Sequence, residues 1–231
     1  MHQEVSDFAA QIDVKFTNKQ LLRRAFTHRS YLNEADREDL KHNERLEFLG
    51  DAVLELATTH FLFAQYPDRP EGELTAIRAA LVNTESISAA AKSLSAEDYL
   101  RLSKGEAKST GRGRDVILAN TYEAIIGAIY LDQGYESARD FISDTLFGKA
   151  EEIVSQESWR DDKSLFQEKA QENVSITPTY KTLSASGPDH DKVFTVGVFL
   201  EDEKVAEGEG KSKQEAESQA ARRALESKNW N

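Results

Sequence analysis

The sequence contains no cysteine, so neither disulfide bonds nor thiolate metal sites can form in its 231 residues. A chain without cysteine suits a reducing compartment. There is no run of about 18 apolar residues, which excludes a transmembrane helix. Residues 1–7 are polar and acidic, without the basic flank and apolar stretch of a signal peptide. We therefore expect a cytoplasmic protein that makes no contact with a membrane.

Basic charge is also scarce. The chain has 29 Lys and Arg against 41 Asp and Glu, a net charge of −12. The excess is spread over both halves, with −9 in residues 1–157 and −3 in residues 158–231. Nucleic-acid binding normally needs clustered Lys and Arg for phosphate contacts. If this chain binds nucleic acid, it must use local basic patches, and part of its acidic excess must be held by metal.

The first two thirds of the sequence have a helical pattern. From residue 18 to about residue 152, apolar residues recur at spacings of three and four. The polar segment 151–162 follows and suits a short linker. We therefore predict an all-α domain over residues 1–155 and a linker over residues 156–161.

The remaining residues, 162–231, predict a small domain of order α-β-β-β-α. Ser164–Gln167 and Ser212–Glu215 have the form of capping boxes that begin helices. Three stretches between them are typical of strands. They are residues 179–184, 193–200 and 204–208.

One predicted helix gathers carboxylates on a single side. At about 100° per residue these carboxylates share a stripe about 80° wide. They are Glu44, Glu47, Asp51 and Glu55. The expected core face of the same helix carries Leu46, Leu49, Val53 and Leu56.

A solvated acidic face is the plain alternative for this stripe. Two observations count against it. Like charges three and four residues apart destabilise a helix by a few tenths of a kcal/mol per pair, and only Arg45 lies nearby to offset them. Phe48 also falls on the acidic side, where a large aromatic ring suits contact with a partner subunit better than contact with water.

A second acidic position lies in the stretch 120–131, which is apolar nearly all round and predicts a buried helix. Glu123 emerges near its start, with Asn120 one turn before it. A buried carboxylate needs a basic partner or a metal, although the helix dipole alone is an alternative for Glu123. Oxygen ligands of these two kinds suit Mg²⁺ or Mn²⁺.

At these residues the sequence resembles the ribonuclease III family. His42–Asp51 matches the family signature nearly residue for residue, and residues 25–31 resemble its lead-in. Glu71-Gly72 and Leu118–Ala124 resemble the two later acidic motifs, and residues 158–231 resemble a double-stranded-RNA-binding domain. The resemblance therefore covers nearly the whole chain.

The resemblance implies an all-α nuclease domain that forms a homodimer, followed by an α+β double-stranded-RNA-binding domain. It implies an endoribonuclease that cuts double-stranded RNA with Mg²⁺, for which Mn²⁺ can substitute. Its products would carry a 5′-phosphate and a 3′-hydroxyl with a short 3′ overhang. Processing of ribosomal and messenger RNA in the cytoplasm is the corresponding cellular role.

The resemblance also implies roles for single residues. The metal ligands would be Glu47, Asn120 and Glu123, and the catalytic residues Asp51 and Glu123. Glu44 and Glu71 would be supporting acids, and Phe48 a knob that enters a socket in the other subunit. Familiar members have Asp where Asn120 stands. An amide oxygen can bind Mg²⁺ but carries no charge, so we expect weaker Mg²⁺ binding with the fold unchanged.

For RNA binding, the resemblance places Gln167 and Glu168 in one minor groove and His190 in the next. Lys211, Ser212 and Lys213 lie where a helix N-terminus would favour phosphate. The family usually has two adjacent basic residues there, whereas Gln214 follows Lys213 in this chain. Taken alone, His190 reads as an ordinary loop histidine and the lysines as surface residues.

Two other functions compete with this interpretation. A catalytically weakened protein that only binds double-stranded RNA is supported by Asn120, while the intact acidic set argues against it. A helical metal-dependent nucleotide pyrophosphohydrolase also uses paired glutamates on helices, but the C-terminal RNA-binding pattern argues against that function.

Overall fold

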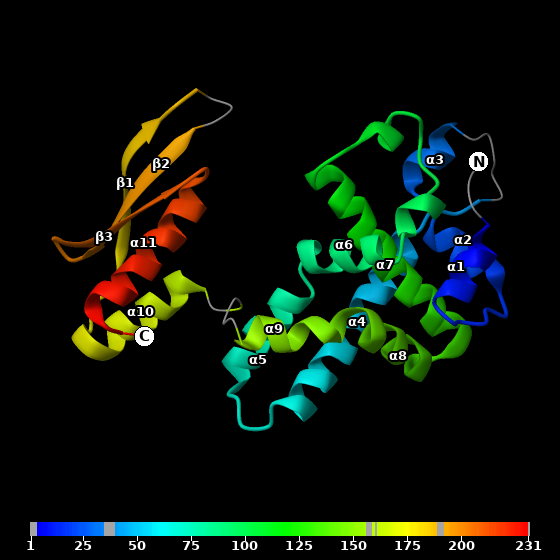
Figure 1. Ribbon diagram of the computed structural model, residues 1–231, viewed down its shortest axis with the longest axis horizontal. Coiled ribbons are helices and arrows are strands. Elements are labelled where there is room, and N and C mark those ends of the chain that lie inside the picture. The colour runs from blue at the N-terminus through cyan, green and yellow to red at the C-terminus, as the bar shows by residue number, and fades with distance from the viewer. Residues whose placement is uncertain (1–3, 35–39, 156–158, 160, 189–191, 231) are drawn as a thin grey trace. The chain divides into compact units, whose positions relative to one another are not determined.

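The chain folds into two compact units, Met1–Trp159 and Arg160–Asn231, in the computed structural model (Figure 1). The structure describes residues 4–34, 40–155, 159, 161–188 and 192–230. The expected linker, residues 156–161, therefore lies largely outside the described residues, and the boundary between the units falls within it. Trp159 packs in the first unit, where the Arg69 guanidinium carbon lies 5.8 Å from its ring centroid.

The described part of the first unit is helical, apart from one isolated bridge between Thr27 and Arg101. Its α-helices are α1 (Val5–Gln11), α2 (Lys19–Ala25), α3 (Arg29–Glu34), α4 (Glu44–Gln65), α5 (Glu71–Leu81), α6 (Thr84–Ser93), α7 (Arg112–Gln133), α8 (Tyr135–Leu146) and α9 (Ala150–Ser155). Short 3₁₀ turns are η1 (Ala96–Tyr99), η2 (Glu106–Lys108) and η3 (Phe147–Lys149). The helical pattern predicted this architecture, but helix α1 lies before the residue at which that pattern was expected to begin.

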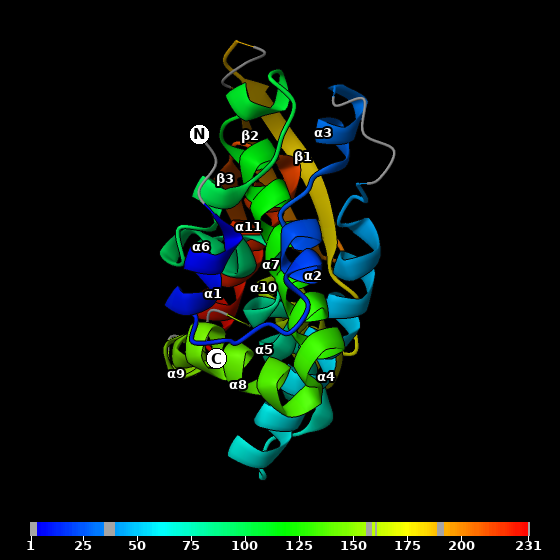
Figure 2. The same ribbon diagram turned by 90° about the vertical axis from the view of Figure 1, so that its right-hand side faces the viewer.

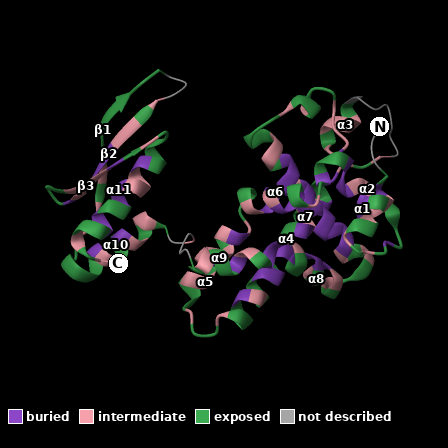
Figure 3. Ribbon diagram, in the orientation of Figure 1, coloured by how far each residue is buried: buried purple, intermediate pink, exposed green. Residues whose placement is uncertain are grey.

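Helix α7 is the centre of the first unit. Between Ile117 and Ile129 every residue is buried except Asn120 and Glu123. Helix α4 runs beside α7, and the buried residues of the unit concentrate on this pair (Figures 2 and 3). The apolar sequence of α7 thus places two polar side chains next to the core on an otherwise covered helix.

The buried face of α4 differs from the expected one. Leu46 and Val53 are buried, but Leu49 is half-buried and Leu56 is 58% exposed, so the assignment of Leu56 to the core was wrong. The face that meets α7 is centred on Gly50 and Leu54. It is therefore displaced around the helix from Leu46 toward the carboxylates. The reason is the small size of Gly50, which lets α7 pack against that side of α4.

Because the buried face of α4 is centred on Gly50 and Leu54, three large apolar residues of this helix remain exposed. Phe48, Leu56 and Phe63 are 82%, 58% and 72% exposed. We call these three residues the α4 stripe. Phe48, whose position beside the carboxylates predicted contact with a partner subunit, is the most exposed of the three.

The second unit is a three-stranded antiparallel sheet with two helices packed on one face. The elements are α10 (Asp162–Val174), β1 (Thr179–Ser186), β2 (Val193–Leu200), β3 (Glu203–Gly210) and α11 (Lys213–Lys228), and the strand order is β1-β2-β3. Alternate residues of β2, Val196, Val198 and Leu200, are buried. Val198 and Leu200 pack with Phe166 of α10 and Leu225 of α11. Alternate residues share one face because successive side chains of a strand point to opposite faces. The order α-β-β-β-α is as predicted.

Both edge strands contain one residue more than the pairing needs. Thr182 pairs with Val196 and Ser184 with Thr195, which leaves Leu183 of β1 unpaired. On the other edge, Val198 pairs with Ala206 and Phe199 with Lys204, which leaves Val205 of β3 unpaired. Each extra residue forms a β-bulge.

One of the two predicted capping boxes is wrong. Asp161, rather than Ser164, caps α10, since its carboxylate accepts a hydrogen bond from the Lys163 N–H at 3.2 Å and from the Ser164 hydroxyl at 2.8 Å. An aspartate placed three residues earlier is an equally good cap and lengthens the helix. Ser212 does cap α11, accepting from the Glu215 N–H at 3.1 Å.

Candidate active site

The start of α4 is fixed to the end of α2 by a buried asparagine. The Asn43 N–H donates to the Thr27 carbonyl at 2.9 Å, and its side-chain amide donates to the Ala25 carbonyl at 3.1 Å. Arg24 adds a hydrogen bond from Nε to the His42 carbonyl at 2.8 Å. Asn43 therefore holds the first turn of α4, which carries Glu47. Sequence reasoning gave Asn43 no role, although a polar residue just before a helix was a usable signal.

Two glycines let α4 and α7 touch backbone to backbone. A Cβ atom on Gly50 would lie 1.7 Å from the Glu123 carbonyl oxygen, and one on Gly127 would lie 2.2 Å from the Leu46 carbonyl oxygen. Any side chain at either position would collide with the other helix. This close approach brings the acidic side of α4 against the polar positions of α7, a role for Gly50 and Gly127 that the sequence did not reveal.

Four candidate metal or catalytic residues meet beside this crossing. Glu47 and Asp51 come from α4, and Asn120 and Glu123 come from α7. The Asn120 side chain lies close enough to Glu47 to act on the pKa of that carboxyl group, which it lowers. The helical wheel had grouped Glu47 and Asp51 on α4, whereas only the family resemblance had added Asn120 and Glu123 of α7 to them.

Burial and crowding of like charges raise the pKa of two of these carboxyl groups. For Glu47, burial is the main cause, followed by the negative charges of Glu44 and Asp51. For Glu123, burial is again the main cause, and with the charges of Asp51 and Glu47 it raises the pKa to about 8. Ionised Glu123 is therefore costly unless a cation lies nearby.

The donor set fits a hard divalent cation. Three carboxylates and one amide supply only oxygen ligands, which Mg²⁺ and Mn²⁺ prefer. Among the described residues, no three His, Asp or Glu side chains are already grouped closely enough to hold an ion. The carboxyl groups nevertheless lie close enough to shift one another's pKa.

The two supporting acids occupy different places. Glu44 lies in the first turn of α4, 3.2 Å from Arg29, and its charge acts on Glu47. Glu71 begins α5 and accepts a hydrogen bond from Thr75 at 3.1 Å. It lines a pocket of about 410 Å³ together with Phe63 of the α4 stripe and Arg78. Glu71 is not among the charges that shift the pKa of Glu47 or Glu123.

The described RNA-binding candidates of the second unit lie on α10 and at the start of α11. Gln167 and Glu168 are exposed on α10 and line a shallow pocket with Ser164, Gln171 and Glu172. Lys211, Ser212 and Lys213 surround the start of α11. The Glu215 carboxylate accepts the Lys211 N–H there at 2.7 Å, so an acid shares this helix terminus with the lysines. His190 lies outside the described residues.

Family models match both units of the chain. Residues 18–150 match the model described as ribonuclease-III-like, and residues 163–228 match the double-stranded RNA binding motif. No helix among the described residues is both long and apolar enough to cross a membrane.

Two curated relatives, both named ribonuclease 3, are similar over most of their length. The protein of Streptococcus pneumoniae strain CGSP14 is 43% identical over 213 residues, which cover 92% of this chain and 91% of that protein. The protein of Protochlamydia amoebophila is 45% identical over 216 residues, with coverage of 94% and 88%.

Among solved structures, a nuclease domain of ribonuclease III from Campylobacter jejuni is similar to the first unit. It is 36% identical with a TM-score of 0.57, and the match covers 63% of this chain and 97% of that one. In that structure, a region involved in dimer formation is structurally flexible.

Proposed function

Because this chain belongs to the ribonuclease III family, we propose that it hydrolyses double-stranded RNA with bound Mg²⁺, for which Mn²⁺ can substitute. The proposed products carry a 5′-phosphate and a 3′-hydroxyl with a short 3′ overhang, and the proposed substrates are precursors of ribosomal and messenger RNA in the cytoplasm. The observation that carries the proposal is the oxygen-ligand cluster at the α4–α7 crossing, where burial and neighbouring acids raise the pKa of Glu123 to about 8.

In this proposal Glu47, Asn120 and Glu123 hold the cation, and Asp51 and Glu123 are the catalytic carboxylates. A bound divalent cation would supply an activated water and neutralise charge on the scissile phosphate. Asn120 would offer its amide oxygen to the cation, and its amide nitrogen could at the same time donate to the neighbouring Glu47, whose pKa Asn120 lowers. Burial disfavours the ionised form of Glu123 unless positive charge lies nearby. The proposed metal ion would supply that charge, which couples this side chain to the metal.

We further propose that the chain acts as a homodimer through the α4 stripe. Phe48, Leu56 and Phe63 are exposed apolar side chains on one side of a single helix, and such patches mark interfaces. In a symmetric dimer the α4 stripe of one subunit would contact the same stripe of the other. Each subunit would then contribute one cutting site. Glu71 lines a pocket with Phe63, which supports its role as a supporting acid near the subunit junction.

The second unit would grip the duplex by its shape. We assign Gln167 and Glu168 of α10 to one minor groove and His190 to the next. Lys211, Ser212 and Lys213 at the start of α11 would contact phosphates, because a helix N-terminus favours negative charge. The Ser212 hydroxyl also caps this helix, so its contribution to RNA would be additional to a structural one.

The decisive experiment compares three proteins on a long RNA duplex during a Mg²⁺ titration. Wild type should cut the duplex, whereas Glu123→Gln should nearly abolish cleavage and leave RNA affinity largely intact. Glu97→Gln, an exposed acid of η1, is the matched control and should cut normally. Nucleoside triphosphates should remain intact in every mixture.

A specific alternative rests on Asn120, which makes the cluster less acidic than in familiar members. If wild type binds duplex RNA but does not cut it at any Mg²⁺ or Mn²⁺ concentration, the chain is an RNA-binding protein. Full activity of Glu123→Gln would remove the proposed metal site.

A further inference from the structure

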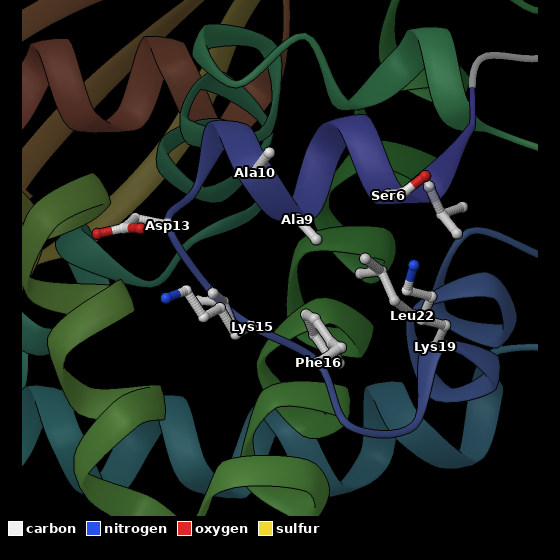
Figure 4. Close-up of a pocket in the computed structure, with 10 residues that line it drawn as sticks. Ser6, Ala9, Ala10, Asp13, Lys15, Phe16, Lys19 and Leu22 are labelled. Atoms are coloured by element: carbon white, nitrogen blue, oxygen red, sulfur yellow. The ribbon is translucent and has the colours of Figure 1, made fainter.

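The first unit has a pocket of about 410 Å³ that lies between α1 and α2 (Figure 4). Its lining comes only from α1, the segment that follows it and the start of α2. None of the candidate active-site residues belongs to these elements. The pocket is therefore separate from the cluster at the α4–α7 crossing.

Hydrogen bonds hold the wall of the pocket in place. Asp13 adopts the left-handed conformation, with φ of 52°, and the next N–H, of Val14, closes the end of α1 by donating to the Ala9 carbonyl at 3.0 Å. Asp132 at the end of α7 accepts the N–H groups of Thr17 and Asn18 at 2.8 and 2.7 Å. The neighbouring Gln133 side chain donates to the Lys15 carbonyl at 3.1 Å. This segment is thus tied to the core at both ends.

The floor of the pocket is apolar, and its rim carries two lysines and one aspartate. Val5, Phe16 and Leu22 are buried, and Ala9 points into the space above Phe16 (Figure 4). Lys19 and the Ser6 hydroxyl stand on one side of this space, and Lys15 stands on the other beside Asp13 (Figure 4).

Neither lysine forms an ion pair with any residue in the part of the chain that the structure describes. Two unpaired cations beside one apolar surface stand out in a chain with a net charge of −12. A ligand that pairs with them must be negatively charged, and a ligand that fills the floor must be apolar.

We propose that this pocket binds a small amphipathic anion. A flat apolar group would lie on Phe16 between Ala9 and Leu22, and a phosphate or carboxylate would contact Lys19 and the Ser6 hydroxyl. The volume lies within the range of about 300–1,000 Å³ that is usual for small-molecule sites. Two sources share this chemistry, a nucleoside monophosphate and a free aromatic acid.

The test is an amide-resolved NMR titration of the full chain with defined probes. Uridine 5′-monophosphate, phenyl phosphate and phenylacetate each combine a ring with an anion. Inorganic phosphate and benzyl alcohol supply one half each. At least one combined probe should shift the amides of the pocket residues and bind at least tenfold more tightly than either half, with the ranking of the three probes identifying the source.

Two variants make the site assignment falsifiable. Lys19→Ala should weaken the tightest combined probe at least fivefold, whereas Lys149→Ala, in a lysine outside the pocket, should not change its affinity. Ala9→Leu should fill the space and abolish binding, while the remaining amide signals report an intact fold. The proposal would be overturned if none of the probes shifted the pocket amides at 10 mM. It would also be overturned if the affinity of the tightest probe were the same in wild type and in both pocket variants. The readout is binding, so it is independent of whether the chain cuts RNA.

Discussion

Asn120 contributes an uncharged oxygen to a cluster that otherwise consists of carboxylates. Asn120→Asp adds one negative charge without changing the size of the side chain, so it should lower the Mg²⁺ concentration at half-maximal cleavage several-fold. It also removes the amide group that lowers the pKa of Glu47, which limits the gain. A Mg²⁺ titration of duplex cleavage measures the shift.

The conservative exchange at Asn18, which lies outside the cluster, is a suitable control, and Asn18→Asp should leave the Mg²⁺ dependence unchanged. Asn120→Asp behaving like this control would show that the side chain at position 120 does not touch the metal.

Single residues also show how far the sequence could predict the site. Helical spacing was enough to group Glu47 and Asp51, because residues on one side of a helix remain on one side in any fold. Glu123 lies on a different helix, and only the family resemblance predicted that it joins them. The spacing could not predict that Glu71 stands apart from them within one chain. That placement depends on the angle between α4 and α5, which distant packing decides.

At the scale of elements, the crossing of α4 and α7 depends on glycine. In Gly127→Ala the new Cβ atom would lie 2.2 Å from the Leu46 carbonyl oxygen, whereas ordinary contacts are 3.4–4 Å. The helices must therefore move apart, which should lower the free energy of unfolding by about 1–3 kcal/mol, as overpacking does. It should also raise the Mg²⁺ requirement, because ligands come from both helices. Urea unfolding and a Mg²⁺ titration measure the two effects.

The matched control for this substitution is Gly148→Ala, where an added Cβ atom meets nothing within 4 Å. It should leave both quantities near their wild-type values. Equal free energies of unfolding for the two variants would mean that the packing of α4 against α7 does not depend on glycine at position 127.

The start of α11 carries another prediction at this scale. Replacing Lys211 and Lys213 together by Ala should weaken affinity for duplex RNA, and the slope of log affinity against log salt should flatten by roughly one unit per lost phosphate contact. The geometry of the cut ends should not change. Binding measured at several salt concentrations gives the slope.

Lys181→Ala is the control, since this lysine stacks on Phe199 at 4.8 Å from the ring centroid and lies away from α11. Its salt slope should equal that of wild type. An unchanged slope in the double variant as well would place the phosphate contacts elsewhere.

The elements show where sequence patterns succeed and fail. The order of α10, three strands and α11 followed from β-branched residues and turns, which act locally. The buried face of α4 was misplaced at Leu56, because apolar periodicity does not distinguish a side chain that faces the core from one that stays exposed. Asp161 displaced Ser164 as a cap because several residues before a helix can compete for the same backbone N–H groups.

At the scale of the whole molecule, the α4 stripe predicts how chains associate. Phe48→Ala should weaken the proposed dimer by about 3–5 kcal/mol, the range for loss of a buried phenylalanine. Sedimentation over a range of protein concentrations measures the dissociation constant. Leu131→Ala, an exposed leucine on α7, should leave it unchanged. An unaltered mass of the Phe48 variant at micromolar concentration would exclude this interface.

The bulges at Leu183 and Val205 affect how several copies of the protein would behave when they bind the same RNA duplex. A long duplex would gather several copies side by side, at local concentrations far above those in solution. Bare strand edges invite neighbouring sheets to join by backbone pairing. Here each edge strand is interrupted by one extra residue. The backbone N–H and C=O groups of a neighbouring strand would therefore no longer align with those of the edge beyond the bulge. Copies crowded on one substrate would therefore remain separate and could dissociate once the strands were cut.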